Sequence, residues 1–182
     1  MKRPLLYILI LLCLMVSAAN AGAAEQKPGE YQVKALFLYN FVNFIDWPAD
    51  SSFRSSPAIN VCIMGDDPFN GAFDVLRDET VKGKRMAIRY YPTYREPKDC
   101  HIIFIPDSES NHTAHILRSI RETGVLTVAD SEESVRQGTV IGFFIEQKRV
   151  RFAINIEAAK RAGLRISAKL LRLARIVNPA EN

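Results

Sequence analysis

Residues 100–105 read Cys-His-Ile-Ile-Phe-Ile and form an almost continuous apolar run that stops at Pro106-Asp107-Ser108. A run of this length with so few polar residues is typical of a β-strand covered on both faces. Two further short apolar runs lie on either side of it in the chain, at 59–64 and 125–128. These runs predict a sheet that is buried on both faces.

Segments with other signals separate these strands. Residues 69–76 look helical, 86–91 alternate like a strand, and 111–123 form a helical pattern that ends at Gly124. Residues 131–137 read as a short helix with a Ser/Asp cap and acidic residues in its first turn. Alternation of strands and helices predicts an α/β fold, with a mainly parallel sheet covered by helices on both faces.

The C-terminal part has a different pattern. The apolar runs 140–145 and 150–156 flank the polar segment 146–149 and predict a β-hairpin. Helices are expected over 157–162 and over 168–176. We therefore expect an antiparallel C-terminal hairpin added to the parallel sheet.

A strong helix is predicted over 31–45, ending before Asp46-Trp47-Pro48. It is apolar around most of its circumference, so it lies centrally in a core or is covered by a partner. Aromatic side chains serve both uses, since they fill cores and also anchor interfaces. The candidate partner-binding aromatic residues are Phe37, Phe41, Phe44 and Trp47.

The N-terminus resembles a secretory signal. Lys2 and Arg3 precede the apolar stretch 5–16, and the small residues Ala19-Asn20-Ala21 follow it. This pattern predicts a signal peptide over 1–21 that is cleaved after Ala21, leaving a single domain over 22–182 outside the cytoplasm. Ala23 is a second candidate for the cleavage position. The other alternative is an uncleaved N-terminal anchor, but the apolar stretch is too short to span a bilayer comfortably.

Removal of the signal lowers the formal net charge from +4 to +2, because residues 1–21 hold Lys2 and Arg3 and no acid. The basic character of the whole chain is therefore partly a property of the signal. Nothing in this charge indicates a nucleic-acid partner, and an exported protein would rarely meet one.

Two cysteines remain after cleavage, Cys62 and Cys100. A lone pair in an oxidising compartment is most simply a disulfide, and closing a loop of this length would stabilise the fold by about 4 kcal/mol. The alternative is two separately buried thiols.

Catalytic and metal-binding patterns are largely missing from the sequence. His112 and His115 share a helix face, but no third ligand accompanies them as in a His-Glu-x-x-His helix, so two solvated histidines are the simpler interpretation. The chain has no Gly-x-Ser-x-Gly nucleophile motif and no glycine-rich phosphate loop. We therefore expect no enzyme activity, no metal and no cofactor.

Three aspartates are candidate ligand-binding residues because they follow predicted strands, where open α/β sheets bind ligands. Asp66 and Asp67 end the strand at 59–64, and Asp130 follows the strand at 125–128. The alternative for the first two is a turn that caps a helix beginning at Pro68. A weaker hypothesis makes one of the pair a hydrolase carboxylate.

Basic residues in the last helical region give a third candidate surface. Arg165, Lys169 and Arg172 recur near helical spacing, with apolar residues on the other face. They would dock an acidic partner or anionic lipid, or they are simply a solvated helix face.

Several segments together resemble the YfiR-like (HmsC-like) family of periplasmic proteins. They are residues 30–48, the turn Gly65-Asp66-Asp67-Pro68-Phe69, the strand 151–156, and 158–167 with its Ala162-Gly163-Leu164-Arg165-Ile166-Ser167 ending. The match covers essentially the whole mature chain, and the motifs occur in the order typical of the family.

The resemblance implies a soluble periplasmic repressor rather than an enzyme. Relatives bind the periplasmic part of an inner-membrane diguanylate cyclase, lower cyclic di-GMP and biofilm formation, and form homodimers. The alternative function is a periplasmic small-ligand-binding domain with its site at the C-terminal ends of the strands. Neither function requires stable insertion into the membrane.

The resemblance also bears on redox sensing. Cys62 and Cys100 match the family's structural disulfide. Some members carry a second cysteine pair in the last hairpin, where this chain has none. Sensing through the hairpin is therefore in doubt here, and a stabilising disulfide is the simpler interpretation.

Overall fold

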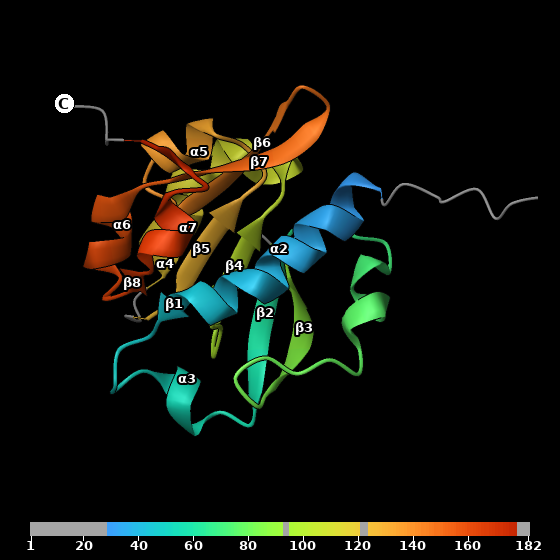
Figure 1. The fold of residues 1–182 in the computed structure, drawn as a ribbon, viewed down its shortest axis with the longest axis vertical. Coiled ribbons are helices and arrows are strands. Elements are labelled where there is room, and N and C mark those ends of the chain that lie inside the picture. The colour runs from blue at the N-terminus through green and yellow to red at the C-terminus, as the bar shows by residue number, and fades with distance from the viewer. Residues whose placement is uncertain (1–28, 93–94, 121–123, 178–182) are drawn as a thin grey trace, which may run out of the picture.

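The computed structural model describes residues 29–92, 95–120 and 124–177, and it confirms the α/β prediction. A seven-stranded sheet has the order β3-β2-β4-β5-β6-β7-β9 and is mainly parallel, with the antiparallel β6–β7 hairpin near one edge (Figure 1). The strands are β2 (Ala58–Met64), β3 (Arg85–Tyr91), β4 (Ile102–Ile105), β5 (Leu126–Ala129), β6 (Ile141–Glu146), β7 (Arg149–Ile154) and β9 (Arg175–Ile176).

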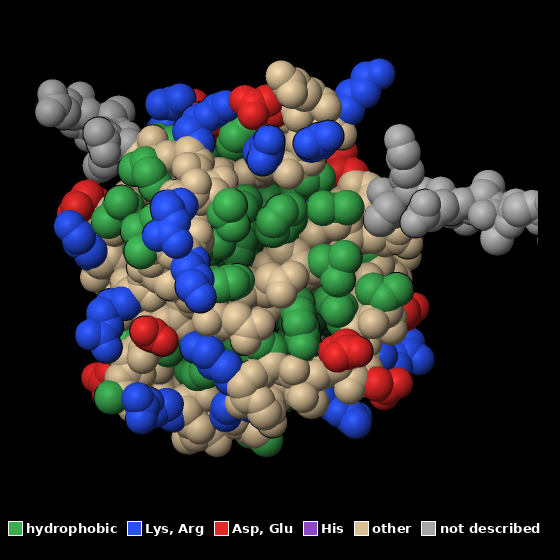
Figure 2. Space-filling view, viewed as in Figure 1, with side chains coloured by type: hydrophobic (Ala, Val, Ile, Leu, Met, Phe, Trp, Pro, Cys, Tyr) green, Lys and Arg blue, Asp and Glu red, His purple; other side chains and the backbone are tan. Residues whose placement is uncertain are grey.

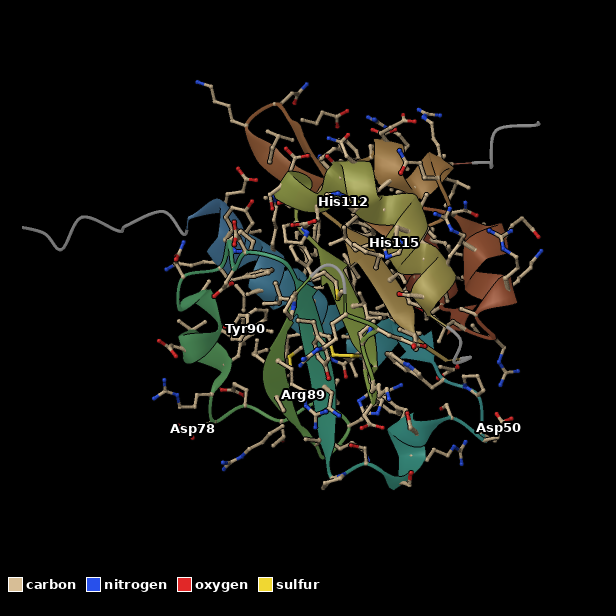
Figure 3. All side chains as sticks on the ribbon, turned by 180° about the vertical axis from the view of Figure 1, so that it is seen from behind. Asp50, Asp78, Arg89, Tyr90, His112 and His115 are labelled. Carbon is tan, nitrogen blue, oxygen red and sulfur yellow. A yellow bond between two sulfur atoms is a disulfide. The ribbon has the colours of Figure 1, made fainter. Side chains whose placement is uncertain are left out.

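Helices cover both faces of this sheet. The long helix α2 (Glu30–Phe44) crosses the face turned to the viewer in Figure 1. The largest buried cluster joins α2 to residues of α6 (Ile156–Arg161) and α7 (Ala168–Leu171). The opposite face carries α4 (Thr113–Ser119) and α5 (Glu133–Arg136), with α4 in front when the molecule is seen from behind (Figure 3).

Strand β4 shows why two-sided coverage is needed. Ile102 and Phe104 belong to the large cluster under α2, whereas Ile103 and Ile105 belong to a second cluster that includes Ile116 of α4. All four strand residues have at most 1% of their surface exposed. Alternate side chains of a strand point to opposite faces, so each face of the sheet needs its own cover.

The C-terminal prediction was right for the hairpin and wrong for the last helix. Helix α7 ends at Leu171, and the chain then adds the short strand β9 beside β7 in place of a helix to residue 176. The Val177 amide donates to the Ile154 carbonyl at 2.9 Å. Backbone pairing with the open edge of β7 therefore replaced the helical hydrogen bonds that the spacing had predicted.

Other local differences are small. The helical pattern at 69–76 is a 3₁₀ turn, η2 (Ala72–Leu76). The pattern at 111–123 is divided between η3 (Asp107–His112) and α4, and residues 121–123 lie outside the described part. Three short elements were not predicted: α3 (Ser52–Ser55) and the two-stranded antiparallel sheet of β1 (Ile45–Asp46) and β8 (Arg165–Ile166).

No helix in the described ranges is long and apolar enough to cross a membrane. The predicted signal peptide over 1–21 lies outside the described residues. Its cleavage therefore stays a prediction.

A disulfide joins Cys62 of β2 to Cys100, with 5.9 Å between their Cα atoms. Both residues are buried, in the cluster under α4. Cys100 lies two residues before β4, which pairs directly with β2. The disulfide therefore ties the loop before β4 to the centre of the sheet.

The double substitution Cys62→Ala/Cys100→Ala is expected to lower the free energy of unfolding by about 3–4 kcal/mol, because it frees the closed loop in the unfolded chain. Urea unfolding followed by circular dichroism measures the change. Reductant should lower the stability of the native protein toward that of the variant and leave the variant unaffected. Equal stability of the native protein with and without reductant would contradict this prediction.

His101 is a buried histidine just before β4, and it lies between Asn60 of β2 and Phe53 of α3. It has 1% of its surface exposed, its Nδ1 accepts from the Asn60 amide at 2.8 Å, and its ring meets Phe53 edge-on at 5.5 Å. Burial lowers the pKa of His101, and the positive charges of Lys84 and Arg89 lower it further. The Ser52 backbone and Asp99 oppose this shift. His101 is therefore neutral in the folded protein near pH 7.

Acid is expected to destabilise the fold through His101. Below a pH of about 6.5 the unfolded chain binds a proton at this position that the folded chain does not, so stability falls as pH falls from 7 to 5. The slope is at most about 1.4 kcal/mol per pH unit. His101→Asn, which retains a δ-position acceptor, should be less stable but should lose this slope. Urea titrations at pH 5, 6 and 7 measure it, with the exposed His115→Gln as control, and an unchanged slope in His101→Asn would refute it.

Candidate functional site

The C-terminal ends of β2, β4 and β5 lie at the same edge of the sheet, because these strands are parallel neighbours. The chain leaves β2 toward β3 on one side and later returns to β4 on the other. The gap between the ends of β2 and β4 is therefore the topological switch point, where open α/β sheets bind ligands.

The space at the switch point is partly filled by a side chain of the protein itself, that of Glu109. Gly65 follows β2 with φ +74°, and a side chain there would collide with the Glu109 carboxylate. Glu109 in turn contacts Nδ1 of His112 at 2.8 Å. Glu109 therefore lies against the turn where a ligand of such a sheet would approach.

A buried network lies next to this point, at the end of β5. The Asp130 carboxylate accepts hydrogen bonds from the Tyr31 hydroxyl, at 2.6 Å, and from the Lys34 ammonium. Lys34 also pairs with Glu30 one helical turn earlier. The side chains of Lys34 and Asp130 are 4% and 2% exposed, so this is a buried ion pair that ties α2 to β5.

Burial is the largest influence on the pKa values of Asp130 and Tyr31. It raises the pKa of Asp130, and the hydrogen bonds from Lys34 and Tyr31 oppose that rise. Burial also raises the pKa of Tyr31, as do its hydrogen bond to Asp130 and the nearby negative charges. Both carboxylate oxygens of Asp130 have a hydrogen-bond donor within the protein.

The two other candidate aspartates have different surroundings. Asp66 is exposed. Asp67 accepts from the Phe69 amide at 2.9 Å and from the Tyr90 hydroxyl at 3.1 Å, so it stabilises the turn after β2. Asp130 is engaged by Lys34 and Tyr31 instead. Ligand binding by the three aspartates stays a prediction.

No metal cluster forms from histidine, cysteine or acidic side chains in the described part of the chain. His112 and His115 both lie on the face that Figure 3 shows, and both are exposed.

The candidate aromatic residues separate into two groups. Phe41 is fully buried and Trp47 is 7% exposed, and Trp47 stacks on Phe53 at 4.2 Å. Phe37 and Phe44 are half-buried against the large core cluster. Only Phe37 and Phe44 therefore present substantial surface to a partner in this structure, and partner binding by all four stays a prediction.

The three candidate basic residues are exposed in the C-terminal segment. Arg165 lies in β8, Lys169 lies in α7, and Arg172 directly follows α7. Figure 2 shows Lys and Arg side chains on the side of the molecule where α6, α7 and β8 lie in Figure 1. Arg175 lies in β9 and, by contrast, forms ion pairs with Glu132 and Glu146.

A broad apolar area lies over α2 on the face shown in Figure 2. Two grooves border the helix there. One, of about 620 Å³, runs between α2 and the β6–β7 hairpin and is lined by Glu30, Val33, Phe37, Ile145, Lys148, Arg149 and Val150. The other, of about 470 Å³, is lined by Gln32, Leu36, Tyr39, Asn40, Val75, Leu76 and Glu79.

Sequence reasoning missed the hairpin groove and the roles of Tyr31 and Lys34. A lysine within an almost wholly apolar helix was a usable signal, because a buried cation requires a paired anion. Nothing in the sequence indicated that this anion was Asp130, 96 residues away. The groove had no local signal, since it forms from two segments that are distant in the chain.

Comparison with known families identifies a match over most of the chain. The model of a family described as YfiR/HmsC-like matches residues 31–175. The match begins at Tyr31 in α2 and ends at Arg175 in β9, so it includes the disulfide and, apart from Glu30, the buried network and the lining of the hairpin groove.

The ion pair of Lys34 and Asp130 is expected to show strong coupling in a double-mutant cycle. Lys34→Met or Asp130→Asn alone should each lower the free energy of unfolding by about 3–5 kcal/mol, because each leaves its buried partner uncompensated. The double variant should lose clearly less than the sum of the two. Urea unfolding measures all three.

Lys160→Met is the control, since Lys160 forms an exposed pair with Glu157, and it should cost less than about 1 kcal/mol. Simple additivity of Lys34→Met and Asp130→Asn would contradict the coupling.

Proposed function

The chain belongs to the YfiR/HmsC-like family, and from that premise we propose that it is a periplasmic negative regulator of a diguanylate cyclase. It binds the periplasmic part of an inner-membrane cyclase and lowers cyclic di-GMP signalling and biofilm formation. The family match over residues 31–175 is the observation that carries this proposal. Membership in a family of regulators also supports the absence of catalysis.

The proposed mechanism is a shift in the cyclase's conformational equilibrium. A repressor that binds the inactive conformation more tightly than the active one increases the inactive population. The repressor needs a stable surface and no chemistry for this. The buried Lys34–Asp130 pair ties α2 to β5 and the disulfide ties Cys100 to β2, and both contacts support a stable fold for such a surface.

We propose that the regulator is exported from the cytoplasm. Cleavage after Ala21 would release residues 22–182 as a single domain into the periplasm, where the oxidising environment favours the Cys62–Cys100 bond. We propose that the mature protein forms a homodimer, as its relatives do. The disulfide then stabilises the fold, because it is buried within the cluster under α4.

The alternative function is binding of a small periplasmic ligand at the ends of the strands, near Asp66, Asp67 and Asp130. Asp67 already accepts from the Phe69 amide and the Tyr90 hydroxyl, Asp130 accepts from Tyr31 and Lys34, and Glu109 lies against the turn after β2. These contacts favour the regulator over the ligand-binding domain.

Deletion of the gene is expected to raise intracellular cyclic di-GMP, because the cyclase loses its repressor. Mass spectrometry of nucleotide extracts measures the level. The full chain supplied from a plasmid should restore it, whereas a version that lacks residues 1–21 should remain in the cytoplasm and fail to restore it. An unchanged level after deletion would overturn the proposed function.

A further inference from the structure

The groove between α2 and the β6–β7 hairpin has the form of a docking site. Its apolar lining continues the core outward. In the hairpin register, Phe143 faces Phe152 and Ile145 faces Val150 on the same side of the ribbon. Phe143 is fully buried under α2, but Ile145 is 52% exposed. The row of apolar side chains on this side of the hairpin therefore extends beyond the part that α2 covers.

The floor of the groove is built from aromatic rings that pack against one another. The ring centroid of Phe37 lies 5.9 Å from that of Phe143 and 5.4 Å from that of Phe152. The ring of Phe41 stacks on Phe37 with 5.8 Å between their centroids. Phe37 and Val33 are half-buried and line the groove. A preformed apolar floor reduces the ordering cost of binding.

The rim of the groove is basic. Lys148 and Arg149 line it, and within the described ranges neither forms an ion pair. The nearby Glu146 is engaged by Arg151 and Arg175. Glu30 is the acidic lining residue, and it pairs with Lys34, which also pairs with Asp130. In Figure 2, Lys and Arg side chains lie above the apolar area, over the hairpin.

The turn that carries Lys148 has an unfavourable backbone for its residues. Gln147 and Lys148 have φ values of 50° and 60°, a two-residue turn that usually contains Asn and Gly. Left-handed backbone is sterically unfavourable for a residue with a side chain. The chain thus places a cation at the rim at a backbone cost.

We propose that this groove binds a segment of a partner protein in which apolar side chains are flanked by Asp or Glu. The apolar side chains occupy the space between Phe37 and Ile145, and the carboxylates meet Lys148 and Arg149. This inference rests on the proposed function and deepens it, because it specifies the surface and the chemistry of the partner.

Charge and shape distinguish this occupant from two others. A second copy bound across a two-fold axis would bring its own Lys148 and Arg149 against the same rim, and like charges would repel. A lipid surface is best met by protruding apolar groups, whereas Val33 and Phe37 line a hollow. The groove across α2 that contains Leu36 and Val75 has no basic lining residue.

Site-specific photocrosslinking in cells that express the full chain tests the inference. A benzophenone amino acid replaces Ile145, with Tyr90, an exposed residue on the edge strand β3 that is labelled in Figure 3, as the control position. Mass spectrometry identifies the crosslinked peptide. We expect a segment of another protein in which the crosslinked apolar residue lies within one helical turn of Asp or Glu.

Charge reversal supplies the matched comparison. Lys148→Glu/Arg149→Glu should reduce the Ile145 adduct at least about tenfold, since it replaces attraction by repulsion. Arg89→Glu/Arg118→Glu changes the same number of exposed charges elsewhere and should leave the adduct unchanged. Thermal unfolding confirms that both variants are folded.

Four results would overturn the inference: no adduct above the level at Tyr90, an adduct with a second copy of this chain, an adduct with lipid, or an adduct insensitive to Lys148→Glu/Arg149→Glu. The inference and the proposed function fail separately. An acidic segment from a protein other than a cyclase would support the groove and contradict the regulator. A rise in cyclic di-GMP on gene deletion, without an Ile145 adduct, would retain the regulator and remove the groove.

Discussion

Helix α2 packs on the sheet through Phe41, which is fully buried and contacts Phe143 and Phe152 at 5.9 and 5.2 Å. This contact joins the N-terminal helix to the C-terminal hairpin. It sets the distance between α2 and the hairpin, and so it shapes the groove beside Phe37. It also holds α2 where Lys34 reaches Asp130 at the end of β5. A change in this packing would alter both the groove and the buried ion pair.

The buried ion pair fixes where α2 lies on the sheet more than it stabilises the fold. A cation and an anion lose much of their hydration when they are buried, and their attraction offsets that loss only in good geometry. Lys34 and Asp130 achieve it with help from Tyr31 and Glu30. The result is a fixed orientation of the first turns of α2 against the strand ends. A surface that recognises a partner gains from such rigidity, because less ordering is required on binding.

Regulation and catalysis make different demands on a fold of this kind. At the ends of its parallel strands, Asp67 and Asp130 serve the protein's own turn and ion pair, and Glu109 lies against Gly65. The apolar surface lies instead over α2 and beneath the hairpin (Figure 2). The structure thus uses Asp67 and Asp130 for internal contacts, and it leaves apolar groups beside a basic rim that forms no ion pair within the described residues. This division favours a binding protein.

The sequence alone determined the fold class, the hairpin, the extent of α2 and the cysteine pair. Apolar periodicity and the Gly and Pro residues that end helices and strands act locally. The family resemblance also agreed with the match over residues 31–175. Only the tertiary structure decided that residues 175–176 form a strand, since the open edge of β7 offered hydrogen bonds that compete with a helix. It also decided that Phe41 lies in the core, that Asp130 pairs with Lys34, and that Ile145 lies across a groove from Phe37. These contacts join residues far apart in the chain, and no local pattern specifies which distant segments meet.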